Sequence, residues 1–186
     1  MKIYRLQSIA EAQGDLVSLG DDRSGRLMRY FIKGDNDGKF LQFTKLKAQA
    51  QPLLTVDAIK DADFLEADVS IPVFSIRAAE ILKENAPEEF EFHPIFITVG
   101  DAELEYRLCK VKIYTKMIDS AHSSFIEFSD KTKIINEAMY FSRFDRQFYM
   151  ARDLKHVSRY VASEKFVALC QRYTLNIAFA ELRQNG

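Results

Sequence analysis

The five residues that follow Ile118 contain the residue types of a hydrolase triad. Asp119, Ser120, His122 and Ser123 supply a carboxylate, an imidazole and two hydroxyls. Triads are defined by geometry, and residues this close in sequence seldom let a serine, its base and an orienting acid align. We therefore expect a loop stabilised by Asp and Ser side chains, with no catalytic residue. Asp119 and Ser123 are candidates for contact with a partner.

Metal and cofactor chemistry finds little support in the sequence. The histidines, His93, His122 and His156, are far from one another, and Cys109 and Cys170 are 61 positions apart. Compact metal sites use closely spaced His and Cys ligands. The seven glycines are scattered singly, so the sequence contains no glycine-rich phosphate-binding loop. We expect no metal and no cofactor, and we interpret both cysteines as reduced and buried.

The segment 139–150 is rich in aromatic and Arg side chains. Phe141, Phe144 and Phe148 have helix-like spacing, which is typical of core residues. Interleaved Arg and aromatic residues are also enriched at protein interfaces, and they can stack on single-stranded bases. These interpretations stay open, although the net charge gives no support to nucleic acid. The candidate partner-binding residues in and just after this segment are Tyr140, Arg143, Arg146 and Arg152.

The elements before residue 60 are predicted from local patterns. Residues 2–9 alternate like a short strand, and residues 10–26 are rich in Gly, Asp and Ser, which suggests turns. Residues 27–32 and 39–44 are two apolar-leaning runs that flank an Asp37-Gly38 pair, which is a hairpin signal. A loop around Pro52 is the predicted lobe boundary.

The last two-thirds of the chain contain two similar units of strand, Ser-capped helix and strand. In the first, Ser75 precedes a helix over 76–85, and strands follow at 90–99 and 106–118. In the second, Ser163 precedes a helix, and residues 176–182 form a strand. These elements predict an α+β fold with a mixed β-sheet flanked by helices.

Length and charge narrow the class of protein. A chain of 186 residues is expected to form a single domain over 1–186, with a possible division into an N-terminal lobe 1–60 and a main region 61–186. The net charge of −1 gives no hint of the basic face that a duplex-binding protein needs. The chain has no apolar run of signal-peptide or membrane-spanning length, so we expect a cytoplasmic protein with no membrane partner.

Three stretches share order and spacing with one protein family. They are Asp63-Phe64-Leu65 with Ile71-Pro72-Val73-Phe74-Ser75-Ile76-Arg77-Ala78, then Tyr106 to Ile118 with Asp119 and Ser123, then Tyr160-Val161-Ala162-Ser163-Glu164-Lys165-Phe166. Through these motifs, residues 63–182 resemble a family of bacterial immunity proteins found beside polymorphic toxins and first catalogued as a domain of unknown function. The chain departs from the family pattern at Ala162 and at Thr174-Leu175-Asn176, which lacks a glycine expected before the last strand.

The resemblance implies a non-enzymatic protein that binds and neutralises a cognate toxin domain in the cytoplasm. It does not name the chemistry of the toxin. One alternative is a small-ligand enzyme with a concave site around Asp119, His122 and Arg152. Another is a nucleic-acid-binding accessory protein, whose basic face would consist of Arg143, Arg146, Arg152 and Lys155.

Overall fold

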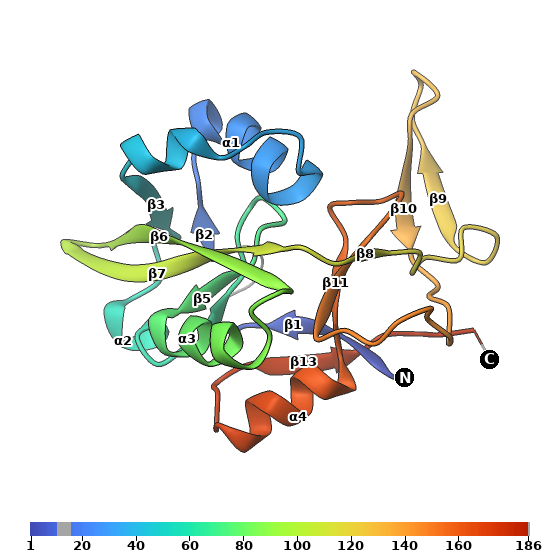
Figure 1. Cartoon of the computed structure of the whole chain (residues 1–186). Helices are drawn as coiled ribbons and strands as arrows, with labels where there is room; N and C mark the ends of the chain where they lie inside the picture. The colour runs from blue at the N-terminus through green and yellow to red at the C-terminus, as the bar shows by residue number, and fades with distance from the viewer. Residues whose placement is uncertain (11–15, 186) are drawn as a thin grey trace.

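The computed structural model describes residues 1–10 and 16–185, with the backbone alone for residues 21–24. The chain is an α+β protein built on two mixed β-sheets, with a separate two-stranded hairpin on one side (Figure 1). This is the class that the sequence predicts. No helix of the described residues is both long and apolar enough to cross a membrane.

The larger sheet has six strands in the order β2-β3-β6-β7-β5-β4. The strands are β2 (Val17–Ser18), β3 (Leu46–Ala50), β4 (Phe64–Leu65), β5 (Val73–Ser75), β6 (Phe90–Val99) and β7 (Ala102–Val111). β3 and β6 are parallel, and the other pairs are antiparallel. The β6–β7 hairpin lies at the centre and pairs at ten positions, from Phe90↔Val111 to Val99↔Ala102.

The second sheet has five strands in the order β13-β1-β12-β11-β8. The strands are β1 (Ile3–Gln7), β8 (Tyr114–Thr115), β11 (Met150–Asp153), β12 (Tyr160–Ser163) and β13 (Ala178–Glu181). β1 lies between β12 and β13, and β11 runs parallel to β8. Residues 1–60 therefore contribute strands to both sheets.

The helices are α1 (Asp21–Met28), which continues into the π-helix η1 (Arg29–Lys33), the 3-10 helix η2 (Lys39–Phe43), α2 (Val56–Ile59), α3 (Ile76–Asn85) and α4 (Glu164–Arg172). α3 and α4 each begin after a serine whose hydroxyl accepts a hydrogen bond from a first-turn N–H. Ser75 Oγ is 3.1 Å from Ala78 N, and Ser163 Oγ is 3.4 Å from Phe166 N. These hydroxyls satisfy backbone donors that a helix leaves unpaired at its start.

The sequence prediction for residues 27–44 is wrong. Residues 27–33 belong to α1 and η1, and residues 39–43 form η2, so no hairpin exists there. Leu27, Tyr30 and Phe31 have helical spacing, and all three are buried against the larger sheet. Burial of this apolar stripe outweighs the Asp37-Gly38 turn signal. Gly38 instead allows a left-handed turn beneath the ring of Tyr30, where a Cβ would collide.

The buried residues form three clusters. One packs α1 and η1 onto the larger sheet and includes Phe31 and Ile97. A second joins α3 and α4 to both sheets and includes Phe74 and Phe166. The third lies beneath the two-stranded hairpin and includes Ile135 and Phe148. Both cysteines, Cys109 and Cys170, are free thiols buried in the second cluster.

Hydrogen bonds of the buried Asp63 connect the larger sheet to the segment between α4 and β13. Its carboxylate accepts hydrogen bonds from the Ser75 hydroxyl and from Asn176 N, the latter at 2.8 Å. Its own N–H donates to Asn176 O at 3.1 Å. Asp63 directly precedes β4, and Asn176 lies between α4 and β13. These bonds therefore hold one edge of the larger sheet against the segment that follows α4.

Candidate protein-binding surface

The two-stranded hairpin consists of β9 (Ser124–Glu127) and β10 (Lys133–Glu137), and it projects from the body of the protein (Figure 1). Its register pairs Glu127 with Lys133 and Ile126 with Ile134. Phe128 N donates to Thr132 O at 2.9 Å, and Lys131 N donates to Phe128 O at 2.9 Å, which closes the turn. Lys131 has a φ of 66°, the left-handed conformation that such a three-residue turn requires.

The two faces of this hairpin differ in exposure. Ile126, Ile134 and Phe128 share one face by alternation, and they are 45%, 48% and 49% exposed. On the other face, Ile135 is 8% exposed and packs into the third core cluster, and its cross-strand partner Phe125 is 37% exposed. We call the first of these the apolar face of the hairpin. Clustered exposed apolar side chains of this kind mark interaction sites more often than isolated ones do.

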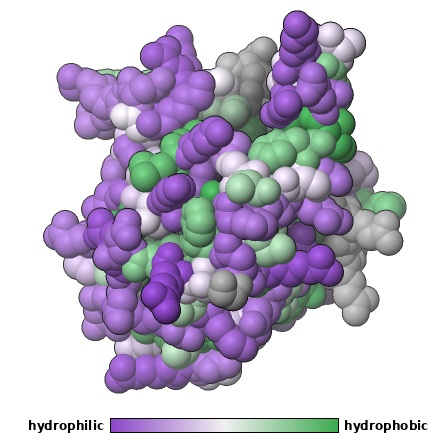
Figure 2. Space-filling view, turned by 90° about the vertical axis from the view of Figure 1, so that its right-hand side faces the viewer, coloured by the Kyte–Doolittle hydropathy of each residue, from purple (hydrophilic) through white to green (hydrophobic). Residues whose placement is uncertain are grey.

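Figure 2 looks onto the side of the molecule that carries the hairpin. Hydrophobic residues gather in the upper right of this view, below a hydrophilic projection. The tip of the hairpin is polar, with Ser129, Asp130, Lys131 and Thr132 in sequence. The apolar surface is therefore bordered by polar groups, which is the usual arrangement at a protein interface.

The base of the hairpin is fixed by the Asp119 loop. Asp119 Oδ1 accepts from Ala121 N at 3.0 Å, and its Oδ2 lies 2.6 Å from His122 Nδ1 and 2.5 Å from Asn185 Nδ2. Ser123 Oγ donates to Asp119 O at 2.7 Å and accepts from Met139 N at 2.9 Å. These bonds clamp the chain entering β9 to the chain leaving β10. The loop stabilised by Asp and Ser side chains is the arrangement that we expected.

This placement changes the roles of Asp119 and Ser123. Asp119 is only 7% exposed, and the Ser123 hydroxyl bonds to two backbone groups. Both residues therefore position the hairpin rather than offer a contact surface. The hydrogen bond from the His122 ring holds the pKa of the Asp119 carboxyl below its ordinary value of 3.8.

Arg152 and Tyr140 are not available to a partner, so the sequence hypothesis for these two residues needs correction. Arg152 has no exposed surface, and its guanidinium donates to the backbone oxygens of Val157 at 3.0 Å and Ser70 at 2.9 Å. Its Cζ lies 5.3 Å from the ring centroid of Tyr160. Tyr140 is 5% exposed in the third core cluster. Both side chains are buried because other elements cover β11 and the segment after β10.

Arg143 and Arg146 are exposed, as a partner-binding role requires. They line a shallow hollow of about 480 Å³ together with Met1, Ser142, Phe144, Asp145 and Gln147. Residues 141–148 form an irregular loop, so the helix suggested by the spacing of Phe141, Phe144 and Phe148 is absent. Only Phe148 of these three is fully buried, with the half-buried Phe144 ring packed edge-on against it at 5.5 Å.

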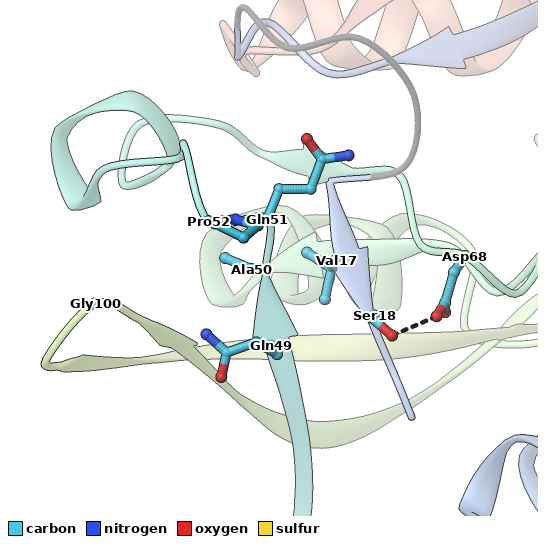
Figure 3. A pocket seen from close by; sticks show the side chains of 8 residues that line it. All are labelled: Val17, Ser18, Gln49, Ala50, Gln51, Pro52, Asp68 and Gly100. Atoms are coloured by element: carbon cyan, nitrogen blue, oxygen red, sulfur yellow. Dashed lines mark hydrogen bonds between the residues drawn. The ribbon is translucent and has the colours of Figure 1, made fainter. Parts of the chain in front are cut away.

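A hollow at the edge of the larger sheet is a candidate small-ligand site. It has a volume of about 390 Å³ and is lined by Val17, Ser18, Gln49, Ala50, Gln51, Pro52, Asp68 and Gly100 (Figure 3). Its one titratable group, Asp68, accepts from Ser18 Oγ at 2.5 Å and from Leu19 N at 3.1 Å. A single carboxylate that already bonds to its neighbours makes a poor acid–base catalyst.

A second polar cluster lies where η1 meets β6. The Tyr30 hydroxyl donates to Glu91, and His93 Nε2 lies 2.9 Å from Glu91 Oε1. Lys110 Nζ sits 3.7 Å from the centroid of the Tyr30 ring. Burial raises the pKa of Tyr30. Phe31 also packs edge-on against His93, so this cluster attaches the π-helix to the sheet. No group of three or more potential metal ligands occurs among the described residues.

Sequence reasoning missed the apolar face of the hairpin. The signal was available, because Phe125, Ile126 and Phe128 on one side of Asp130-Lys131 and Ile134 and Ile135 on the other resemble two strands around a turn. Exposure, however, could not be read from that pattern. Comparison with known proteins adds no assignment, because no family model and no curated protein matches the chain.

Proposed function

We propose that this chain is a non-enzymatic protein-binding protein whose contact surface is the apolar face of the β9–β10 hairpin. The observation that carries the proposal is the exposure of Ile126, Phe128 and Ile134, each about half exposed, on a hairpin that forms a two-stranded sheet of its own in the described residues. A two-stranded hairpin is marginally stable in water unless its apolar face is covered. A partner that covers these side chains gains from burying them and also rigidifies the hairpin.

The partner that we propose is a toxin domain, which this chain neutralises as a bacterial immunity protein. Support for this finer step comes from the motifs at residues 63–78, 106–123 and 160–166 and their resemblance to immunity proteins. Asp119 and Ser123 belong to the second motif, and they hold the base of the hairpin. In this proposal, those residues matter because they set the position of the binding surface.

The experiment is coexpression of the chain in bacteria with the toxin domain that this proposal places in a neighbouring gene. We expect the wild-type chain to restore growth and the double variant Ile126→Ser/Ile134→Ser to lose that protection. The matched control is Phe43→Ser/Leu53→Ser, which removes two apolar side chains that are 86% and 94% exposed elsewhere. The proposal fails if wild-type chain gives no protection, or if both double variants protect equally well. Nucleic-acid binding would instead appear as salt-sensitive binding of a single-stranded oligonucleotide by the isolated chain, which substitution of Arg143 and Arg146 removes.

A further inference from the structure

The two long edges of the hairpin differ in their free backbone groups. Phe128 bonds to Thr132 through the backbone, so 128/132 is a hydrogen-bonded pair, and the alternation makes 126/134 the next one. The intervening pairs, 127/133 and 125/135, then direct their N–H and C=O groups outward. On β9 the outward groups belong to Phe125 and Glu127, and on β10 they belong to Lys133 and Ile135.

The outer edge of β10 is partly closed by the body of the protein. Arg159 Nη2 lies 3.4 Å from the outward Ile135 O, and the Ile135 side chain is buried. All four residues of β9 are exposed, and β9 has β10 as its one strand neighbour within the described residues. The edge of β9 is therefore the one that can accept a further strand. An open strand edge is a template for pairing with another chain.

We infer that the partner adds an extended segment to the free edge of β9, which makes the hairpin a three-stranded sheet. This inference rests on the proposed function, because it specifies how the same surface binds. Main-chain hydrogen bonds to Phe125 and Glu127 supply the attachment, and side chains on alternate positions supply selectivity. The cross-strand pair Ile126–Ile134 forms an apolar row, which an apolar partner residue opposite Ile126 extends.

The charge of residues 112–159 indicates which residue types should flank the apolar positions in the partner's added strand. The exposed residues of 112–159 include eight Lys and Arg against four Asp and Glu, although the whole chain has a net charge of −1. The exposed Arg143 and Arg146 lie in the loop after β10. Phe144 of that loop packs on the same core cluster as Ile135 of the hairpin. The fitting occupant is thus an extended strand of the partner with alternating apolar residues and acidic residues beyond them.

Two matched proline variants test this inference. Glu127→Pro removes an outward N–H from β9, and Lys133→Pro removes one from β10. Both preserve the inward hydrogen bonds, and both break the same exposed Glu127–Lys133 ion pair of 2.9 Å. Proline is tolerated at strand edges whose N–H faces away from the ladder. The two variants should therefore perturb the isolated hairpin equally, and they differ in which edge they block.

The probe is the same toxin domain that the proposed function places in a neighbouring gene, titrated against each full-length variant. We expect Glu127→Pro to weaken binding by at least about tenfold and Lys133→Pro to change it by less than about twofold. We also expect the Phe125 and Glu127 amides of the wild-type chain to exchange with solvent more slowly in the complex, as followed by NMR. Equal loss of binding in both proline variants, or unchanged exchange at these amides, overturns the inference.

The remaining outcomes separate this inference from the proposed function. If Ile126→Ser/Ile134→Ser abolishes binding while Glu127→Pro binds normally, the apolar face is the contact surface and strand addition is wrong. If the wild-type chain forms no complex with the toxin domain, both proposals are wrong. Light scattering of the isolated chain tests whether a second copy of the chain pairs with the β9 edge. A dimer that Glu127→Pro dissociates would mean that a second copy of the chain occupies the β9 edge, which also overturns the inference.

Discussion

The β6–β7 and β9–β10 hairpins are the same local unit used in two different ways. β6–β7 has a strand on either side, β3 and β5, and its apolar residues Ile95, Ile97 and Leu108 are fully buried. β9–β10 has no flanking strand in the described residues, and Ile126 and Ile134 are about half exposed. Strand pairing by itself therefore does not make a hairpin part of the folded core. A hairpin with a strand on each edge and a buried apolar face stabilises the fold, and one left open is available to a partner.

The largest expected effect comes from truncating one isoleucine in each hairpin. Ile97→Ala removes side-chain atoms from the first core cluster and leaves a cavity, so it should lower the free energy of unfolding by about 2–5 kcal/mol. Ile134→Ala removes a side chain that is already 48% exposed, and we expect less than about 0.5 kcal/mol. Urea unfolding followed by circular dichroism measures both. Similar losses would show that β9–β10 contributes to the core as β6–β7 does.

A second prediction compares the loss of stability on substituting Arg152, which is buried, and Arg146, which is exposed. Arg152→Ala leaves the carbonyl oxygens of Ser70 and Val157 without their donor inside the protein, and it should cost about 2–3 kcal/mol of stability. Arg146→Ala removes an exposed side chain and should change stability by less than about 0.5 kcal/mol. Thermal unfolding of the two variants tests the difference. An unaffected Arg152→Ala variant would contradict the internal role that we assign to Arg152.

Two non-glycine residues with left-handed backbone conformations allow the body of the protein and the hairpin to be compared. Thr174, after α4, has a φ of 52°, and Lys131, at the tip of the hairpin, has a φ of 66°. A β-branched residue is strained in this region, so Thr174→Gly should raise the free energy of global unfolding by about 1 kcal/mol. Lys131→Gly should slow amide exchange within β9–β10 without changing global unfolding, if the hairpin opens independently. A gain in global stability from Lys131→Gly would show that the hairpin and the body unfold together.

The smallest expected effect is the response of the hairpin base to acid. The folded pKa of Asp119 lies below its ordinary value of 3.8, so the carboxylate stabilises the loop above that pH. Its contribution is lost as pH falls through the lowered folded pKa. NMR shifts of the hairpin amides should therefore change below about pH 4 in the wild-type chain, and Asp119→Asn should remove that change. A transition that persists in Asp119→Asn would assign the response to another group.

The sequence predicted the elements that have strong local signals. Ser75 and Ser163 mark the starts of α3 and α4, and the strand predicted at 90–99 is β6. The strand predicted at 106–118 is divided between β7, which ends at Val111, and β8 of the second sheet. Residues 27–44 were misread because a turn signal between two short apolar runs fits a hairpin as well as it fits helices. Periodicity cannot settle that choice, because packing on the sheet decides it.

The candidate surface was less predictable than the fold. Arg152 and Arg146 are the same residue type and lie six positions apart, yet one is fully buried and the other exposed. That difference depends on where distant segments, such as the one containing Ser70, meet β11. Ile126 and Ile97 present the same problem, because both occupy strand-like sequence. Local patterns identify a strand, whereas tertiary contacts determine which strand remains uncovered.

The central claim is that the open hairpin is the binding surface, and its most direct test is an affinity measurement by isothermal titration calorimetry. Wild-type chain, Ile126→Ser/Ile134→Ser and Phe43→Ser/Leu53→Ser are each titrated with the toxin domain that the proposed function requires as the partner. Truncating a hot-spot side chain at the centre of an interface costs about 2 kcal/mol or more, so the hairpin variant, which truncates two such side chains, should bind at least about 100-fold more weakly. The control variant should bind like wild type. An unchanged affinity in the hairpin variant, with its fold intact by circular dichroism, would contradict the account.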